Sequence, residues 1–229
     1  MENNHNFLYV IWKDPISRRN YIIGKLTKGN KYTFEYCEEY KNALSAGWKL
    51  LSAFPDEKLY ESDTLFAAFA SRLPDPKRRG IETILQKYGL DKYDGYELLR
   101  RSSGRLPIDT YEFIDPIFPD DKTIEKDFYL MGSRHHMACK GEDCSLRTDL
   151  ITGDEVSLSP DKDNQYDKYA IIVKSKDKTI LGYIPRYYSQ SVYMRLEKRM
   201  TYQCIITELS TDSGCQNCIK VKLTMPKAE

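Results

Sequence analysis

The sequence predicts an α+β protein built from two parts that follow one another along the chain. Residues 7–115 combine short apolar strands with helical periods, which predicts a small sheet with helices. Residues 122–226 hold mainly short strand patterns and one helical stretch, which predicts a small β-barrel or curled sheet with one helix. Two prolines and three acidic residues in residues 115–121 oppose regular structure, so residues 116–121 are the expected linker.

The first part begins with three strands joined by turns. Residues 7–12, 21–26 and 31–36 are rich in aromatic and β-branched residues, as strands are. Residues 13–15 (Lys-Asp-Pro) and 28–30 (Lys-Gly-Asn) lie between them and carry residues that favour turns, because proline fixes φ and aspartate bonds nearby backbone amides. This order predicts a three-stranded meander.

Helices are expected next, because apolar residues recur every three or four positions. Ser62 or Asp63 is a suitable N-cap for the first helix, and Gly89 a suitable C-cap for the second. Gly47 interrupts a less regular candidate. The expected elements are helices at 61–73, 77–88 and 94–101, a short helical stretch within 38–54, and a closing strand at 111–114.

The second part reads mostly as strands. Its single expected helix spans residues 188–200, in which Val192, Leu196 and Met200 are four positions apart. The expected strands are 126–131, 155–158, 170–173, 180–184, 203–208 and 218–224.

Composition narrows the class of protein. The chain of 229 residues is long enough for one large domain or two small ones. Residues 1–115 hold 18 Lys+Arg and 17 Asp+Glu, and the remainder holds 17 of each, so neither part is a generally basic nucleic-acid binder. No apolar run is long enough to span a membrane, and residues 1–6 do not resemble a signal peptide. We therefore expect a cytoplasmic protein whose six cysteines are reduced or metal-bound.

Four sequence blocks in the second part occur in a specific order. They are Gly-Ser-Arg-His-His at 132–136, Glu-Val-Ser-Leu at 155–158, Asn-Gln-Tyr-Asp at 164–167 followed by Ala-Ile at 170–171, and Gly-Tyr-Ile-Pro-Arg at 182–186. With these blocks, residues 126–225 resemble a HIRAN domain. The resemblance implies an OB-like barrel, and some members of this family, in DNA-remodelling enzymes, hold the 3′ end of single-stranded DNA.

The resemblance also implies roles for individual residues. Arg134 would meet a phosphate, Tyr166 would stack on or frame a base, and Asp167 would accept a hydrogen bond from the terminal hydroxyl. The sequence departs from the family pattern at His135 and His136, which replace tyrosines, and at Gln165, which replaces proline. The alternative is a structural turn in which Tyr166 is packed and Asp167 caps the backbone. The candidate DNA-binding residues are Arg134, His135, Asn164, Tyr166, Asp167 and Tyr183.

The first part resembles the N-terminal subdomain of HipA-type kinases. The resemblance covers residues 7–115 and rests on the order of weak blocks rather than on any single one. They are Gly-Lys-Leu at 24–26, a Tyr-Thr-Phe-Glu-Tyr strand at 32–36, Leu-Ser-Ala-Phe-Pro at 51–55, Leu-Pro-Asp at 73–75, Arg-Arg at 78–79, Glu-Leu-Leu at 97–99 and Ser-Gly at 103–104. Pro76 stands where a glycine is usual in the family.

A HipA-type kinase needs a catalytic core beyond this subdomain, whereas here the second part has the pattern of a barrel. The sequence also lacks the glycine-rich phosphate-binding motifs. In split HipA-type toxin–antitoxin systems, a small protein that resembles this subdomain binds and neutralises a separate kinase. The resemblance therefore implies a non-catalytic antitoxin whose partner is a HipA-like Ser/Thr kinase. A HipB-like DNA-binding subunit is an optional further partner. The alternative is a module that binds single-stranded DNA ends in genome maintenance or phage defence.

Two further features allow more than one interpretation. Two cysteine pairs, Cys139 with Cys144 and Cys215 with Cys218, have spacings that suit tetrahedral zinc, so they predict either a structural zinc site or four reduced thiols in loops. Three arginine pairs, at 18–19, 78–79 and 100–101, are either solvated faces or contacts for an acidic kinase surface.

Overall fold

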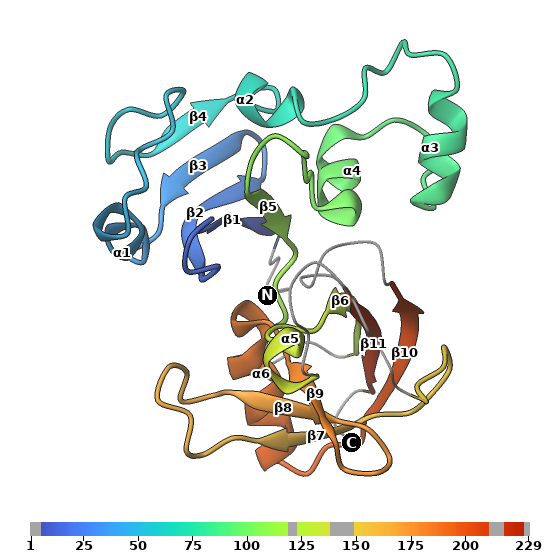
Figure 1. Cartoon of the computed structure of the whole chain (residues 1–229). Coiled ribbons are helices and arrows are strands. Elements are labelled where there is room, and N and C mark those ends of the chain that lie inside the picture. Colours follow the sequence, from blue (N-terminus) through green and yellow to red (C-terminus); the bar gives the residue numbers. More distant parts are fainter. Residues whose placement is uncertain (1–5, 119–122, 138–148, 211–217, 227–229) are drawn as a thin grey trace. The chain divides into compact units, whose positions relative to one another are not determined.

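The computed structural model describes residues 6–118, 123–137, 149–210 and 218–226 (Figure 1). The chain divides into two compact units, Met1–Pro116 and Ile117–Glu229. The expected linker at 116–121 is described only up to residue 118. No helix in the described part of the chain is long and apolar enough to cross a membrane.

The N-terminal unit contains one five-stranded sheet with the order β4-β3-β2-β1-β5, in which every neighbouring pair is antiparallel. The expected meander forms its centre, and the closing strand β5 returns to pair with β1. The strands are β1 (Phe7–Lys13), β2 (Asn20–Lys28), β3 (Tyr32–Tyr36), β4 (Tyr60–Ser62) and β5 (Tyr111–Ile114).

Four helices belong to this unit: α1 (Tyr40–Ser45), α2 (Ala67–Ala70), α3 (Ile81–Lys87) and α4 (Gly95–Ser102). The helix predicted over 61–73 is wrong for most of its length, because Glu61 and Ser62 pair with β3 and Phe66 is still extended, with ψ 133°. The helix predicted from residue 77 begins only at Ile81, since Gly80 adopts a left-handed conformation with φ +78°.

The start of α4 agrees with its predicted position within one residue. Asp94 Oδ1 accepts hydrogen bonds from the amides of Tyr96 (2.9 Å) and Glu97 (3.0 Å), so it is the N-cap of the helix. Its second oxygen is 2.8 Å from the ammonium of Lys28 on β2. The same carboxylate therefore caps the helix and ties it to the sheet.

Aromatic side chains fill the core of the N-terminal unit. The ring of Phe34 lies 4.3 Å from that of Phe54 and 5.3 Å from that of Phe69, measured between centroids. A Cβ at Gly24 would lie 2.5 Å from the Phe34 ring, so this strand position requires glycine.

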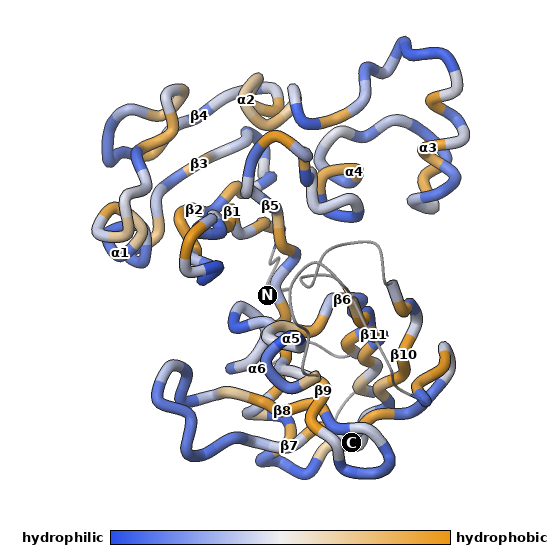
Figure 2. Tube along the Cα trace, in the orientation of Figure 1, coloured by the Kyte–Doolittle hydropathy of each residue, from blue (hydrophilic) through white to orange (hydrophobic). Residues whose placement is uncertain are grey.

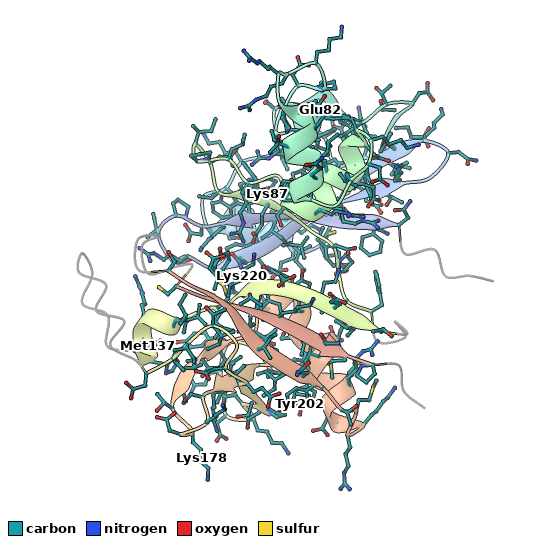
Figure 3. The ribbon with its side chains drawn as sticks, turned by 90° about the vertical axis from the view of Figure 1, so that its right-hand side faces the viewer. Glu82, Lys87, Met137, Lys178, Tyr202 and Lys220 are labelled. Atoms are coloured by element: carbon teal, nitrogen blue, oxygen red, sulfur yellow. The ribbon has the colours of Figure 1, made fainter. Side chains whose placement is uncertain are left out.

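In contrast to this apolar interior, the segment that leads into α3 is strongly hydrophilic (Figure 2). Two charged residues, Glu82 and Lys87, lie on α3 itself (Figure 3).

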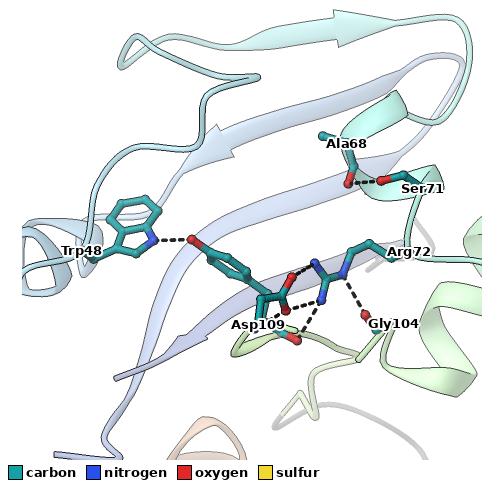
Figure 4. A network of polar contacts seen from close by, with 7 residues as sticks. Trp48, Ala68, Ser71, Arg72, Gly104 and Asp109 are labelled. Atoms are coloured by element: carbon teal, nitrogen blue, oxygen red, sulfur yellow. Dashed lines mark hydrogen bonds and ion pairs between the residues drawn. The ribbon is translucent and has the colours of Figure 1, made fainter. Parts of the chain in front are cut away.

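An ion pair between a buried arginine and a half-buried aspartate holds the loop before β5 (Figure 4). Arg72 donates to both carboxylate oxygens of Asp109 at 2.7 Å, and its Nε donates to the carbonyl of Gly104, also at 2.7 Å. Next to this pair, Trp48 Nε1 donates to the hydroxyl of Tyr111 at 2.8 Å. The loop is thus fixed by a bidentate ion pair, which is stronger than a hydrogen bond between neutral groups.

The C-terminal unit contains two three-stranded antiparallel sheets, with orders β10-β11-β6 and β7-β8-β9. Single bridges between Met131 and Tyr183 and between Glu155 and Ile205 join the two sheets. The unit is a mixed sheet-and-helix structure, and its ladders do not close in the described residues, so the OB-like barrel stays a prediction. The strands are β6 (Ile124–Tyr129), β7 (Ser157–Pro160), β8 (Ile171–Lys174), β9 (Ile180–Tyr183), β10 (Gln203–Leu209) and β11 (Ile219–Met225).

Two helices complete this unit: α5 (Ser133–His136), a single turn after β6, and α6 (Arg186–Glu197). Helix α6 begins at Arg186, two residues before the predicted start at residue 188. Val192 is fully buried on α6. The buried guanidinium of Arg195 donates to the carbonyl of Phe118 at 3.1 Å, which anchors the segment that enters the unit. Lys178 lies at the exposed turn between β8 and β9 (Figure 3).

Candidate nucleic-acid interface

The loop between β7 and β8 is shaped by its own side chains. Asn164 Oδ1 accepts hydrogen bonds from the amides of Tyr166 and Asp167, both at 3.0 Å. Asp167 Oδ1 then accepts from the amide of Tyr169 at 2.9 Å. Asparagine and aspartate favour such turns because their oxygens replace a backbone acceptor. Two consecutive side-chain turns therefore fix the backbone on both sides of Tyr166.

Asp167 also attaches the loop to α6. Its Oδ2 accepts a hydrogen bond at 2.7 Å from the hydroxyl of Ser189, which is 1% exposed on that helix. A carboxylate offers about four acceptor positions, and these contacts use two of them. Asp167 thus has the capping role of the structural alternative and still has acceptor capacity for a ligand hydroxyl.

Tyr166 does not pack against the protein. Its residue exposure is 87%, among the highest of the large apolar or aromatic residues in the described part of the chain. This contradicts the alternative in which Tyr166 is packed. A tyrosine ring held on a fixed turn and exposed to solvent is available for stacking on a base.

A second group of side chains lies around Asp161, at the start of the same loop. Asp161 Oδ2 accepts from the hydroxyl of Tyr183 at 2.9 Å and from Asn164 Nδ2 at 3.1 Å. Burial, and then the contact with Asp161, raise the pKa of Tyr183 above its usual value. Tyr183 on β9 therefore supports the Asn164 turn with its hydroxyl.

The rings of His136 and Tyr183 meet with centroids 5.6 Å apart, which brings α5 to this group. Burial, together with neighbouring His135, lowers the pKa of His136 below 6.5, although Asp161 opposes the shift. His136 is accordingly neutral at pH 7. On the same turn, Arg134 Nε donates a hydrogen bond to His135 Nε2 at 3.2 Å. Arg134 is half-buried and His135 is exposed.

Gly182 allows α5 to lie close to β9. Met131 and Tyr183 exchange two backbone hydrogen bonds, at 2.8 and 2.9 Å. Gly182 has φ +146°, and a Cβ there would lie 2.7 Å from the carbonyl oxygen of Met131. Any side chain at residue 182 would push the Arg134 turn away from the Tyr183 ring.

Hydrogen bonds therefore link Asn164, Tyr166 and Asp167 within one loop. Tyr183 is linked to this loop through Asp161, and His136 packs against the ring of Tyr183. Asp161, His136 and Ser189 were not among the residues predicted from the sequence to bind DNA. The signal for Asp161 is weak, because an aspartate at the start of a polar loop is common. Ser189 gives no signal in the sequence, because only the fold places it beside Asp167.

The predicted zinc site falls mostly outside the described residues, which exclude Cys139, Cys144 and Cys215. Cys218 is described and is 3% exposed, directly before β11. In the described ranges, no three His, Cys, Asp or Glu side chains gather as a metal site would require. The zinc site stays a prediction.

Comparison with known protein families gives two matches along the chain. A family model for the HipA N-terminal domain matches residues 16–107, and a family model for the HIRAN domain matches residues 125–222. The two matches do not overlap, and each falls within one of the two compact units. No curated protein sequence matches the chain significantly.

Two solved structures are similar to part of the chain. The crystal structure of the HIRAN domain of human HLTF has 14% sequence identity and a TM-score of 0.34, and the match covers 45% of this chain and 74% of that one. The crystal structure of a protein from Lactobacillus plantarum has 23% identity and a TM-score of 0.36, with 46% and 99% covered.

Proposed function

We propose that this chain, which joins a HipA N-terminal domain to a HIRAN domain, is a non-catalytic binding protein with one partner for each domain. The HIRAN domain would hold an end of single-stranded DNA. The HipA N-terminal domain would bind and neutralise a separately encoded HipA-like Ser/Thr kinase. The two halves of this proposal have separate support and separate tests.

The observation that carries the DNA proposal is the exposed ring of Tyr166 on its fixed turn. Stacking on this ring costs no conformational entropy for ordering the backbone, since the turn is already fixed before binding. Asp167, on the same turn, offers acceptor positions for a terminal hydroxyl, and Arg134 supplies a cation for a phosphate.

Fluorescence anisotropy with a labelled dT10 oligonucleotide tests this proposal. We expect Tyr166→Ala to weaken binding of the free 3′ hydroxyl end by about 1–3 kcal/mol, the usual contribution of one stacked base. Ile151→Ala is a matched control, because Ile151 is 65% exposed in the same unit but not in this loop. The wild-type chain should prefer the 3′ hydroxyl over a 3′ phosphate. Equal affinity of wild type and Tyr166→Ala, or no binding at all, would contradict the proposal.

The order of the two domains supports the kinase proposal. A HipA N-terminal domain is followed here by a HIRAN domain, whereas in a HipA-type kinase the catalytic core follows it. A HipA N-terminal domain that is followed directly by a HIRAN domain suits a protein that acts on a separate kinase. A HipB-like DNA-binding subunit is a further partner that such a system can include.

The test begins with affinity purification of the tagged chain from its native cells and mass spectrometry of the proteins that co-purify. We expect a HipA-like kinase in a stoichiometric amount. That kinase is then produced alone, and its phosphorylation activity is measured with increasing amounts of this chain. A kinase that stays fully active in excess of the chain would show that the N-terminal domain does not neutralise it.

A further inference from the structure

Two isoleucines in the N-terminal unit are almost completely exposed. Ile16 is 90% exposed and Ile108 is 87% exposed, the two highest values for large aliphatic residues in the described part of the chain. Single exposed apolar side chains are common on protein surfaces and need no explanation. Their significance depends on whether the two lie together and on how each is held.

The two isoleucines lie at the same end of the sheet. The amide of Lys13, at the end of β1, donates to the carbonyl of Thr110, just before β5, at 3.0 Å. Ile16 follows Lys13 by three residues, and Ile108 precedes Thr110 by two, so they extend from neighbouring antiparallel strands. An exposed proline precedes each isoleucine. We name this surface the isoleucine tip; it consists of Pro15, Ile16, Pro107 and Ile108.

Buried and half-buried carboxylates hold both loops of the isoleucine tip. Asp14 is 6% exposed, and its oxygens accept from the amides of Ile16 (3.0 Å) and Ser17 (3.1 Å). In the second loop, Asp109 binds Arg72 and accepts from the amide of Tyr111 at 3.1 Å. The β-branched side chains are stiff themselves, so a partner that covers them loses little entropy in ordering them.

The charge around the isoleucine tip is positive. The acidic residues next to the isoleucine tip already have partners within the protein. Asp14 caps its own turn, Asp109 binds Arg72, and Glu112 binds Arg105. Arg18 and Arg19 directly follow the first turn, and none of the described carboxylates forms an ion pair with them. A second copy of this chain would place the same arginines against each other, which is unfavourable. The surface instead fits a different protein with an apolar recess bordered by carboxylates.

We propose that the isoleucine tip is the surface through which the HipA N-terminal domain binds its kinase, with Ile16 and Ile108 entering an apolar recess and Arg18 and Arg19 facing acidic residues at its border. This inference rests on the proposed kinase partner and adds the contact surface to it.

The test uses biolayer interferometry to measure binding of the full chain to the HipA-like kinase recovered in the affinity purification, produced as a recombinant protein. We expect Ile16→Asp and Ile108→Asp each to weaken the affinity at least tenfold, because each places a carboxylate where the partner is apolar and acidic. Leu59→Asp is the matched control, since Leu59 is 54% exposed in the same unit but outside the isoleucine tip. Arg19→Glu should weaken binding and flatten its dependence on salt concentration.

The outcomes separate the two proposals. If the wild-type chain and Leu59→Asp bind equally well and both isoleucine variants bind weakly, the inference holds. If both isoleucine variants bind within twofold of wild type, the kinase proposal stands and the isoleucine tip is not its contact surface. If the wild-type chain does not bind the kinase, both proposals fail. Circular dichroism of each variant confirms that the exposed substitutions leave the fold unchanged.

Discussion

Replacing Asp109 by alanine should destabilise the N-terminal unit selectively. The substitution leaves the guanidinium of Arg72, whose side chain is 8% exposed, without its carboxylate. It also removes the acceptor for the amide of Tyr111 at the start of β5. Arg72 keeps its hydrogen bonds to the carbonyls of Gly104 (2.7 Å) and Tyr111 (3.3 Å), but no opposite charge replaces Asp109 in this network.

The expected loss of unfolding free energy is about 2–3 kcal/mol. Removing one partner of a fully buried ion pair costs about 3–5 kcal/mol, because the remaining charge is neither paired nor hydrated. The side chain of Asp109 is 26% exposed, so water can partly replace the carboxylate and reduce the loss. In the double variant Arg72→Met/Asp109→Ala the unpaired charge is gone, so its loss should be smaller than the sum of the two single losses by about 1 kcal/mol or more.

Tryptophan fluorescence reports on this unit alone. The chain has two tryptophans, Trp12 and Trp48, and both are buried in the N-terminal unit. Their emission during urea denaturation therefore follows the N-terminal unit even if the two units unfold separately. Lys58→Ala is the control for an exposed ion pair, since Lys58 and Asp56 are 59% and 61% exposed, and it should cost less than about 1 kcal/mol.

The pH dependence gives a second check on Asp109. Burial alone would raise the pKa of this carboxyl, but the hydrogen bonds from Arg72 and from the Tyr111 amide outweigh it, and the pKa lies below its usual value. A lowered pKa means that the pair stabilises the fold above the unfolded pKa of about 3.9 and loses this effect as the pH falls through the folded value. The difference between wild type and Asp109→Ala should be constant from pH 6 to 8 and shrink in acid. A loss below about 1 kcal/mol at pH 7, or additive losses in the double variant, would refute this account.

Three further predictions concern the C-terminal unit. Gly182→Ala should lower its unfolding free energy by about 1–3 kcal/mol, measured by circular dichroism, because residue 182 has φ +146° and a Cβ would meet the Met131 carbonyl; an unchanged stability would contradict this. DNA binding should strengthen as the pH falls through the lowered pKa of His136, because its imidazole then gains a positive charge, and His136→Gln should reduce this dependence in an anisotropy titration. If the four cysteines at 139, 144, 215 and 218 form one site, atomic emission should find about one zinc per chain, and metal-free protein would rule it out.

The sequence predicts most strands of this protein well, because their signals are local. The meander, the closing strand and the start of the helix predicted over 94–101 all lie within one or two residues of their predicted positions. The ordered blocks of motifs also predict both domains, and the two family models confirm them. The predicted helix at 61–73 is wrong because its first residues pair with β3, and a helical period in the sequence carries no information on a distant strand that offers hydrogen bonds.

The candidate DNA site is only partly visible in the sequence for a similar reason. Asn164 and Asp167 are recognisable because asparagine and aspartate shape turns locally. The partners that fix them, Ser189 on α6 and Tyr183 on β9, are distant in sequence, and only the fold brings them together. The exposure of Tyr166 likewise depends on the whole unit, because the same four residues would also suit a turn with a packed tyrosine.

The structural role of this loop and its proposed binding role are compatible, because Asp167 shares in both whereas Tyr166 serves only the proposed binding. Asp167 joins the loop to a buried hydroxyl, so Asp167→Ala should cost about 1–2 kcal/mol of stability and also weaken DNA binding. Tyr166 makes no comparable contact, so Tyr166→Ala should weaken DNA binding and leave the melting temperature unchanged. A purely structural loop predicts the opposite for Tyr166, namely no change in DNA binding. In the proposed function the turn presents the ring without itself having to become ordered, and the two variants measured side by side separate the contribution of the turn from that of the ring.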